Sequence, residues 1–274
     1  MTGKDDRITA SSFSIGSEDY YMIILFILLA VAIGFVLLML KQANENHVLR
    51  HDMQVYGEHE TLTLFFISDI HTRLIAQQML QTITEPIDAV IIGGDFADRR
   101  TPRTRIEENL RQLQQLGPIY FVWGNNDREV GEAWLRECFS RYDVTIIEND
   151  ALILPNSKNR IWLSAIDDTS ANYNIELAIE QCKDEKMIFI SHNPYIFYKV
   201  REKIRPILMM GGHLHGGQIR FGSYGLHPHG SYSKRQGIQT LISNGYGTTL
   251  VPFRLGAKPQ CHIISIQLDK EATY

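Results

Sequence analysis

The sequence has little cysteine and no excess of basic residues. Only three cysteines, Cys138, Cys182 and Cys261, are spread over 274 residues, which argues against a disulfide framework and against a thiolate zinc site. We expect each to be a small buried side chain, a usage that fits a reducing compartment. With 27 lysines and arginines against 31 acidic residues, the chain lacks the basic surface that nucleic-acid binding usually requires.

Charge is absent from one long stretch near the N-terminus. The segment Tyr21–Leu40 has no charged residue, and as a helix it would be about 30 Å long, enough to cross a bilayer. A secretory signal has a shorter apolar region followed by a cleavage site. A buried helix of a soluble protein would show polar residues on one face. This segment has neither the short apolar region and cleavage site of a signal nor such a polar face. We therefore predict a polar tail at 1–19, a single transmembrane helix at 20–41, a linker at 42–60 and one domain at 61–270.

The residues beside this helix indicate its orientation. Lys41 follows the apolar segment directly, whereas Glu18 and Asp19 precede it. Because lysine and arginine close to a membrane tend to stay on the cytoplasmic side, we expect a cell-membrane protein with its C-terminal domain in the cytoplasm. The anchor also suggests a substrate at or in the membrane.

Apolar runs and helical patterns alternate along the rest of the chain. Strands are expected at 61–70, 88–94, 186–192, 206–213, 238–243 and 261–267, and another begins at 119; helices are expected at 72–85, 102–116, 131–143 and 173–183. Such alternation predicts an α/β fold in which helices cover the sheets. The stretch 221–237 is rich in glycine, serine, tyrosine and histidine, and is expected to be a long loop near a site.

A polar cluster follows each of five apolar strands. In α/β folds the carboxyl ends of strands are where ligand sites form, so five such clusters in succession indicate one shared site. The clusters are Asp69-Ile-His71, Gly94-Asp95-Phe-Ala-Asp98, Gly124-Asn125-Asn126-Asp127, His192, and Gly212-His213-Leu-His215.

The order DxH, GDxxD, GNx[DE], H, GHxH resembles that of the calcineurin-like metallophosphoesterases. The resemblance covers about residues 61–267, and the stretches GHLHGGQIR and ISNGYGTTLVPFRLGAKPQ are similar to a membrane-associated branch that includes UDP-2,3-diacylglucosamine pyrophosphatase-like enzymes. It implies two β-sheets sandwiched between helices, and two divalent metal ions between the sheets. Ligands implied for one metal are Asp69, His71 and His215, ligands implied for the other are Asn125, His192 and His213, and Asp95 would bridge both.

The implied ligand set is chemically reasonable. A carboxylate that bridges two cations about 3.5–4 Å apart lets them share a water, lower its pKa and offset charge on a phosphoryl group. Hydroxide formed in this way would attack the phosphorus. Four imidazoles among the ligands favour Mn, Fe or Zn over Mg or Ca. The resemblance therefore implies a metal-dependent phosphohydrolase acting on a phosphodiester or phosphoanhydride.

Asn126 departs from the family pattern, which usually has a histidine that helps protonate the leaving oxygen. Asparagine cannot deliver a proton at neutral pH, and three readings remain open. The substrate has a good leaving group, as a phosphoanhydride or activated diester does; His227 or His229, from the loop, supplies the proton; or the protein is a weak or inactive relative that serves as a membrane-tethered, metal-containing binding or regulatory module.

Three further residues are candidates for supporting roles. Asp98 and Asp127 are expected to orient a neighbouring ligand or to cap a turn. Arg254 is a candidate for contact with a substrate phosphate, or for a surface salt bridge.

A nuclease function is disfavoured by the acidic balance of the chain. The oligomeric state is not indicated by any of these residues.

Overall fold

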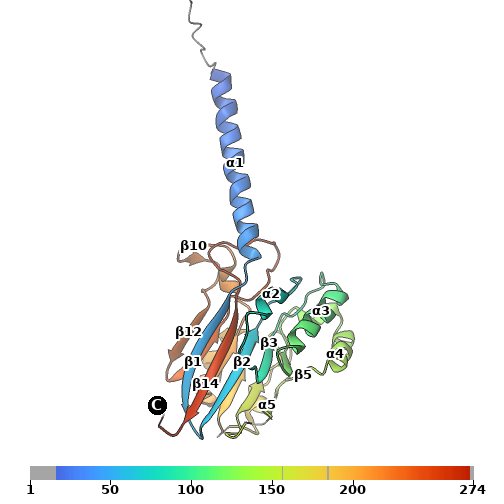
Figure 1. Ribbon diagram of the computed structural model, residues 1–274, viewed down its shortest axis with the longest axis vertical. Helices are drawn as coiled ribbons and strands as arrows, with labels where there is room; N and C mark the ends of the chain where they lie inside the picture. Colours follow the sequence, from blue (N-terminus) through green and yellow to red (C-terminus); the bar gives the residue numbers. More distant parts are fainter. Residues whose placement is uncertain (1–16, 156, 184, 272–274) are drawn as a thin grey trace, which may run out of the picture.

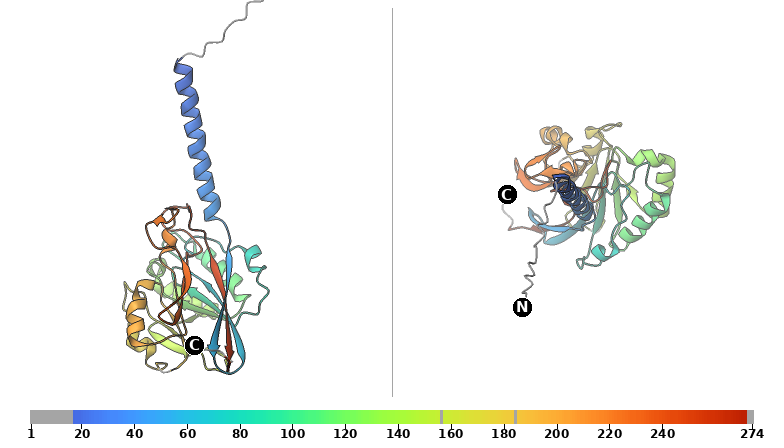
Figure 2. Two further views of the ribbon diagram at one scale, coloured as in Figure 1. Left: turned by 90° about the vertical axis from the view of Figure 1, so that its left-hand side faces the viewer. Right: turned by 90° about the horizontal axis from the view of Figure 1, so that it is seen from above.

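The fold consists of a long N-terminal helix and an α/β domain. The computed structural model describes residues 17–155, 157–183 and 185–271. Figure 1 shows α1 projecting from one end of the domain, and Figure 2 shows from a second direction that most of the helix extends beyond the domain. The helix α1 spans Ser17–Ala43, and the part Glu18–Ala43 is long and apolar enough to cross a membrane, since an 18-residue window within it has a mean hydropathy of 3.3.

The domain contains two six-stranded sheets. The first has the order β1-β14-β2-β3-β4-β5, and the second β12-β13-β9-β8-β7-β6. The strands of the first sheet are β1 (Val48–Tyr56), β14 (Cys261–Asp269), β2 (Glu60–Ile67), β3 (Ala89–Gly93), β4 (Ile119–Val122) and β5 (Thr145–Ile146). Those of the second are β12 (Ser231–Arg235), β13 (Ile238–Ile242), β9 (Leu208–Gly211), β8 (Met187–Ile190), β7 (Trp162–Ala165) and β6 (Asp150–Ile153).

Helices cover the outer faces of both sheets. The first sheet is covered by α2 (Gln77–Leu80), α3 (Arg103–Gln114) and α4 (Glu132–Arg141), and the second by α5 (Ile175–Ile179) and α6 (Phe197–Lys203). Short 3-10 turns lie at Asp127–Val130, Pro194–Ile196 and His215–Gly217. This arrangement confirms the predicted α/β fold with two sheets between helices.

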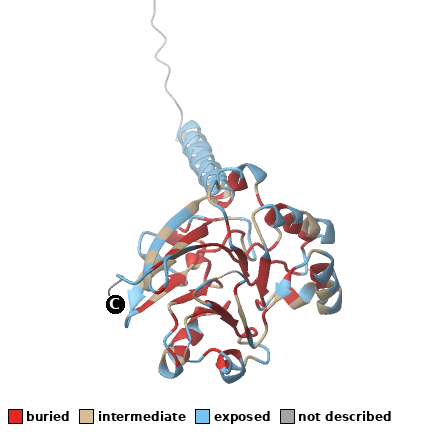
Figure 3. Cartoon of the chain, turned by 60° about the horizontal axis from the view of Figure 1, so that its bottom comes forward, coloured by how far each residue is buried: buried red, intermediate tan, exposed pale blue. Residues whose placement is uncertain are grey.

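Alternation along the central strands explains the layers. In β2, Phe65 and Ile67 pack under the helices, whereas Leu64 and Phe66 face the other sheet, because successive side chains of a strand point to opposite faces. Both faces are apolar, so the strand reads as one continuous hydrophobic run. Figure 3 shows the resulting buried layers through the domain and the exposed surface of α1.

Residues 48–56, expected to be part of a linker, form β1 instead. This strand pairs in parallel with β14 along its whole length, from Val48 with Cys261 to Tyr56 with Asp269. It lies at the edge of the sheet, and its exposure alternates between half-buried and exposed positions. An edge strand tolerates polar and charged residues, and these gave VLRHDMQVY the composition of a linker.

Two other expectations about local structure were wrong. The helix expected at 72–85 is reduced to α2 because side chains of α3 bind the preceding backbone: Asn109 accepts from the amide of Ile75 at 2.9 Å and donates to the carbonyl of Arg73 at 3.0 Å. The loop expected at 221–237 contains strand structure, namely β12 and a small hairpin formed by β10 (Arg220–Phe221) and β11 (Tyr224–Gly225).

Candidate metal centre

The strand directions place the polar clusters at the end of the domain from which α1 emerges. Four residues separate the end of α1 from the start of β1, which runs away from the helix, and β14 is parallel to β1. Strand β2 is antiparallel to β14, and β3 and β4 are parallel to β2. The carboxyl ends of these three strands therefore return to the foot of α1. They are followed by Asp69 and His71, by Asp95, and by Asn125.

The second sheet supplies the remaining histidines. His192 follows β8, and His213 and His215 follow the neighbouring parallel strand β9. The two sheets are joined at this point, because the amide of His213 donates to Asp69 Oδ1 at 2.9 Å. Ligand candidates from both sheets thus meet in one place.

Five of the seven predicted ligands form two overlapping groups. Ligand atoms of Asp69, His71 and His215 lie within 4.8 Å of one another, as do those of Asp69, Asp95 and His192. Asp95 Oδ2 lies 3.3 Å from His192 Nε2 and 3.7 Å from His71 Nε2. The Asp95 carboxylate is therefore positioned between imidazoles of the two groups, as a bridging ligand would be.

The other two predicted ligands lie at the rim of these groups. His213 is half-buried, with Nδ1 3.3 Å from His192 Nε2. Asn125 is exposed, and its amide nitrogen donates to Asn126 Oδ1 at 2.9 Å. The loop that bears both asparagines is held to the centre by the amide of Asn126, which donates to Asp95 Oδ1 at 2.8 Å.

The rings of the buried histidines are fixed by their outer nitrogens. His192 Nδ1 lies 2.9 Å from the carbonyl of Gly93. A carbonyl only accepts, so Nδ1 carries a proton, and when the ring is neutral, as metal binding requires, Nε2 presents its lone pair to the centre. In the same way His71 Nδ1 faces Asp98 Oδ2 at 3.3 Å, which directs His71 Nε2 inward.

The two buried carboxylates at the centre, Asp69 and Asp95, have no lysine or arginine partner among the described residues. Asp69 and Asp95 are 0% and 3% exposed, and in the described part of the chain the basic groups within 4 Å of either carboxylate are imidazoles. His71 Nε2 and His215 Nε2 face each other at 3.2 Å. Buried carboxylates and opposed ring nitrogens are costly unless a cation lies among them. The residues therefore fit divalent metal ions.

The imidazoles differ in their affinity for protons. Burial alone would lower the pKa of His192, but the Asp95 and Asp69 carboxylates and the carbonyl of Gly93 together outweigh it and raise that pKa to about 10. At His215, burial and the adjacent His71 lower the pKa well below its ordinary value. At neutral pH the metal-free centre therefore holds a proton on His192 and keeps His215 neutral.

Binding of Mn²⁺ to the metal-free protein is expected to tighten as pH rises. A histidine with a raised pKa is protonated below that pKa, and a metal must displace the proton. Between about pH 6 and pH 8, each proton released is expected to strengthen binding by roughly tenfold per pH unit. Titration calorimetry in two buffers of different ionisation enthalpy would measure the affinity and count the protons. An affinity that is flat or falls with pH would contradict this assignment of the proton.

The backbone of the centre is strained. Five predicted ligands have a positive φ: 54° at Asp69, 50° at His71, 49° at Asp95, 69° at His213 and 48° at His215. A residue other than glycine costs roughly 1–2 kcal/mol of conformational free energy in this left-handed region. Such strain is retained mainly at functional sites. Gly94, at φ 85°, has the related role of leaving room, because a Cβ there would lie 2.6 Å from His192 Nδ1.

Asp98 and Asp127 lie where they can position the predicted ligands. Asp98 faces His71 and is itself held by Arg100, whose Nη2 lies 2.8 Å from it. Asp127 is fully buried, and its carboxylate accepts backbone amides of Asp95, Ala97 and Gly124 at 2.9, 3.1 and 2.7 Å. It therefore joins the loops after β3 and β4. Burial and the Asp95 charge raise the pKa of Asp127 to about 7.

Arg254 occupies a position different from both expectations for it. Its side chain is 0% exposed, and its guanidinium donates to backbone carbonyls that include those of Gly247, Ala257 and Asn244. Its Nη2 also lies 3.3 Å from His215 Nδ1. Arg254 is thus neither in a surface salt bridge nor free to bind a substrate phosphate. Its hydrogen bonds join the loops around His215 to one another.

One of the two loop histidines, His229, contacts a residue that sequence reasoning missed, Asn244. His229 is exposed, and its Nε2 accepts from Asn244 Nδ2 at 3.2 Å. The other end of that amide, Asn244 Oδ1, accepts from the amide of Gly230 at 2.7 Å. Asn244 is buried and is the second residue after β13, which ends at Ile242. The strand-end rule that found the other clusters could therefore have found it.

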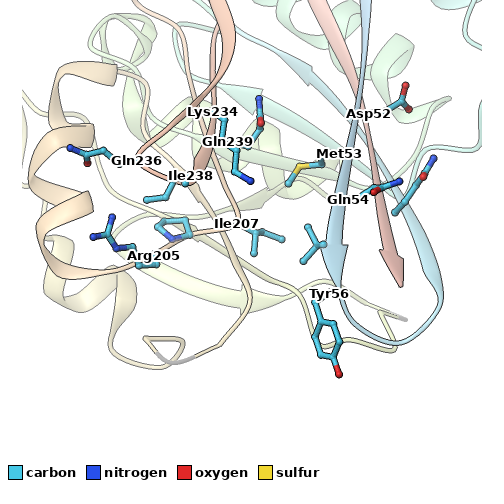
Figure 4. A pocket seen from close by; sticks show the side chains of 14 residues that line it. Asp52, Met53, Gln54, Tyr56, Arg205, Ile207, Lys234, Gln236, Ile238 and Gln239 are labelled. Carbon is cyan, nitrogen blue, oxygen red and sulfur yellow. The ribbon is translucent and has the colours of Figure 1, made fainter. Parts of the chain in front are cut away.

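A separate cavity lies at the opposite end of the domain. It has a volume of about 620 Å³ and opens between the far half of β1 and the segments that precede β9 and β13, with Met53, Arg205 and Lys234 among its lining residues (Figure 4). Because these segments are the ends of the strands remote from α1, the cavity is not part of the metal centre.

The double sheet, with buried acids and imidazoles at its strand ends, defines a metal-dependent phosphoesterase. The model of the family described as calcineurin-like phosphoesterase matches residues 62–217, and the chain belongs to that family. Because the aligned region ends at Gly217, it includes the strand-end clusters of both sheets.

Related proteins support this assignment. The chain is 39% identical to the uncharacterized protein YpbG of Bacillus subtilis (strain 168), over 82% of this chain and 89% of that one. It is 30% identical to the uncharacterized metallophosphoesterase YkoQ of the same organism, over 73% and 81% of the two chains. The phosphodiesterase YaeI of Escherichia coli (strain K12) is 23% identical, over 63% and 68%.

Proposed function

We propose that this protein is a membrane-anchored phosphoesterase that holds two divalent metal ions and hydrolyses a phosphodiester or phosphoanhydride. The observation that carries the proposal is the pair of overlapping ligand groups around Asp69, with Asp95 between His71 and His192. One ion would be held by Asp69, His71 and His215, the other by Asn125, His192 and His213, and Asp95 would contact both. Mn, Fe or Zn suits this mixture of imidazole and carboxylate.

The chain's own residues would bind and orient the reactants. Bound divalent ions activate a water molecule and offset the charge on the phosphoryl group. The carbonyl of Gly93 and the Asp98 carboxylate keep His192 and His71 in the tautomer that presents Nε2. Asp127 keeps the loops after β3 and β4 at a fixed separation. Such outer partners preserve ligand geometry and tune the basicity of the rings.

Among the described residues, the site provides no clear proton donor for the leaving group of the substrate. Asn126 is half-buried, its amide nitrogen lies 3.3 Å from Glu129 Oε1, and it can donate a hydrogen bond but not a proton. His229 is held by Asn244, with Nδ1 3.0 Å from the carbonyl of Gly230. A phosphoanhydride or an activated diester, whose leaving oxygen needs little protonation, therefore suits this site better than an alkyl ester.

The substitution Asn126→His tests this reading. If Asn126 marks a missing acid, the variant is expected to raise turnover of alkyl phosphodiesters by roughly 10²-fold, the usual contribution of a general acid. Turnover of bis-p-nitrophenyl phosphate, which has a good leaving group, should change little. Steady-state rates on both substrates would measure the difference. Equal effects on the two would count against the assignment.

Replacement of His229 by alanine tests the other source of a proton. If His229 protonates the leaving group, His229→Ala should remove the limb of the pH–rate profile that this histidine controls, for an alkyl ester substrate. An unchanged profile would leave the good-leaving-group reading as the better account. Asn244→Ala is the matched variant, since it would release His229 without removing the imidazole.

We further propose that α1 anchors the protein and that its substrate lies at the membrane. Support comes from the length and hydropathy of Glu18–Ala43 and from the place of the metal centre, at the end of the domain where α1 enters (Figure 1). Lys41, at the domain side of the helix, favours a cytoplasmic domain. A lipid-linked phosphate or nucleotide-lipid would meet the site at this surface.

A second function is favoured by the same Asn126. A catalytically weak, membrane-tethered binding or regulatory module could keep the metals and dispense with an efficient proton donor. The two functions are separated by assaying the full chain in detergent micelles with Mn²⁺ on bis-p-nitrophenyl phosphate and p-nitrophenyl phosphate. The phosphoesterase proposal expects metal-dependent turnover, faster on the diester. Absence of turnover in folded protein that holds two metals would favour the binding module.

A further inference from the structure

Exposed apolar side chains surround the foot of α1. Tyr224, Leu226 and Leu250 are 82%, 85% and 85% exposed, unusually high values for large apolar residues grouped on one face. Phe221 and Val251 lie in the same two segments and are also exposed. We call these five residues the collar. Contiguous exposed apolar surface of this kind marks an interaction site.

The collar is held together by one buried side chain. Gln218 Nε2 donates to the carbonyls of Thr249 and Val251 at 2.9 and 3.1 Å, and its Oε1 accepts the amide of Thr249 at 2.8 Å. Gln218 comes just before the β10–β11 hairpin, so these bonds join the hairpin to the loop that bears Leu250. The collar is therefore one surface built from two segments.

The collar is also fixed against α1. The rings of Phe221 and Phe35 stack, with centroids 6.5 Å apart and an interplanar angle of 7°. The amide of Arg254, which follows the second collar segment, donates to the carbonyl of Met39 at 3.2 Å. Figures 1 and 2 both show the β10 region beside the lower end of the helix.

The contact with Phe35 sets the depth of the hairpin. Phe35 is six residues before Lys41, the first charged residue on this side of the span, which is about 9 Å along the helix axis. If Lys41 lies at the membrane surface, Phe35 lies within the apolar layer, and Phe221, stacked on it, lies there as well. An exposed aromatic hairpin at this depth meets lipid and not water.

We propose that the collar inserts into the same bilayer as α1 and seats the metal centre against the membrane surface. This inference rests on the membrane anchor of the proposed function. The occupant is the lipid bilayer, because the collar is continuous with the membrane-spanning surface of α1. Two contacts lead from the collar to the site: Arg100 Nη1 lies 3.4 Å from the carbonyl of Leu250, and Arg100 also holds Asp98, which faces His71.

The position of the metal centre against the membrane surface would determine how a substrate approaches. His215 lies five residues before the hairpin begins, and Arg254 connects it to the Met39 turn of α1. Arg99 and Arg100 are exposed near the loop of Leu250, where cations attract anionic head groups. An amphipathic phosphate ester could therefore reach the metals while its apolar part stays among the lipids.

Site-specific labelling of the full chain tests the proposal. All three native cysteines are buried, so Tyr224→Cys and Leu250→Cys each introduce one accessible thiol for an environment-sensitive fluorophore. The matched control is Leu177→Cys, an exposed apolar position on α5, at the other end of the domain. Ile27→Cys, in the middle of α1, reports insertion of the anchor. Each protein is reconstituted into vesicles of phosphatidylcholine and phosphatidylglycerol, and lipids spin-labelled on the acyl chain serve as quenchers.

The expected result is a blue-shifted emission and roughly a twofold loss of intensity by lipid quenchers at positions 224 and 250, as at 27, with no change at 177. Quenching at 27 alone would overturn the collar proposal and leave the anchor intact. Quenching at none of the positions would overturn the anchor together with the collar. Labels at 224 and 250 that are shielded from both lipid and aqueous quenchers would assign the collar to contact with a second copy of this chain, which also contradicts the proposal. Circular dichroism of each variant would confirm that it is folded.

Discussion

Asp95→Asn will abolish metal-dependent turnover while leaving the fold intact. Asp95 lies between the two imidazole groups and carries a charge that the proposed metal ions would require, and asparagine has the same shape without that charge. We expect kcat/KM on bis-p-nitrophenyl phosphate to fall by at least roughly 10³-fold. Asparagine also tolerates the left-handed backbone at this position, where φ is 49°, so misfolding should not obscure the result.

The control for Asp95→Asn is Asp143→Asn. Asp143 has the same residue type and the same φ of 49°, but it is exposed and lies in the turn after α4. Asp143→Asn should retain the activity and the melting temperature of the unaltered protein. A variant Asp95→Asn that keeps most of its turnover would show that this carboxylate does not join the two metal positions.

Asp127→Ala is expected to cause a large loss of stability. Its carboxylate is the acceptor for three buried backbone amides, at 2.7 to 3.1 Å. Each buried donor left without a partner costs about 1–3 kcal/mol, so we expect the free energy of unfolding to fall by about 3–5 kcal/mol. Because the loops that bear Asp95 and Asn125 are released, affinity for Mn²⁺ should fall as well. Urea denaturation and metal titration would measure the two effects.

Asp150→Ala is a suitable comparison for Asp127→Ala. Asp150 is exposed, and its carboxylate accepts the amide of the next residue, so its removal should change the free energy of unfolding by less than about 0.5 kcal/mol. A loss at Asp127 no larger than the loss at Asp150 would mean that water replaces the carboxylate, and that the two loops do not depend on it.

The parts of the fold that could be predicted are those with a short-range pattern. The central strands are continuous apolar runs, and the polar residues that end them, such as Asp69 after β2 and His192 after β8, therefore stood out. The apolar helix was equally clear, since Tyr21–Leu40 contains no charge. These local signals were enough to predict which residues would converge, although the distances between them required the structure.

The parts that could not be predicted depend on contacts between distant residues. The edge strand β1 has Arg50, His51 and Asp52 in its middle, and only its pairing with β14 makes it a strand. Arg254 looks like a surface cation in the sequence, but a cluster of backbone carbonyls from 244–257 encloses it. Burial lowers the pKa of Arg254 to about 9, which still leaves it charged at neutral pH. No local sequence pattern predicts that an arginine will be surrounded by backbone carbonyls in this way.

The end of the molecule at which α1 enters combines both kinds of information. The sequence predicts an anchor, and the strand directions place the candidate metal centre at the foot of α1. The contact of Phe35 with Phe221 then relates the depth of the hairpin to that of the helix. A protein arranged in this way would act at a membrane surface, and the collar variants test that arrangement independently of turnover.

The most direct test of the central claim is a metal titration of turnover by the full chain. The protein is stripped with EDTA, and hydrolysis of bis-p-nitrophenyl phosphate is followed as Mn²⁺ is added, with bound metal counted in the same samples. Our account predicts no turnover without metal and a rate that saturates at two ions per chain. Turnover that persists in metal-free protein, or a folded chain that holds two ions and hydrolyses neither this diester nor a phosphoanhydride, would contradict it.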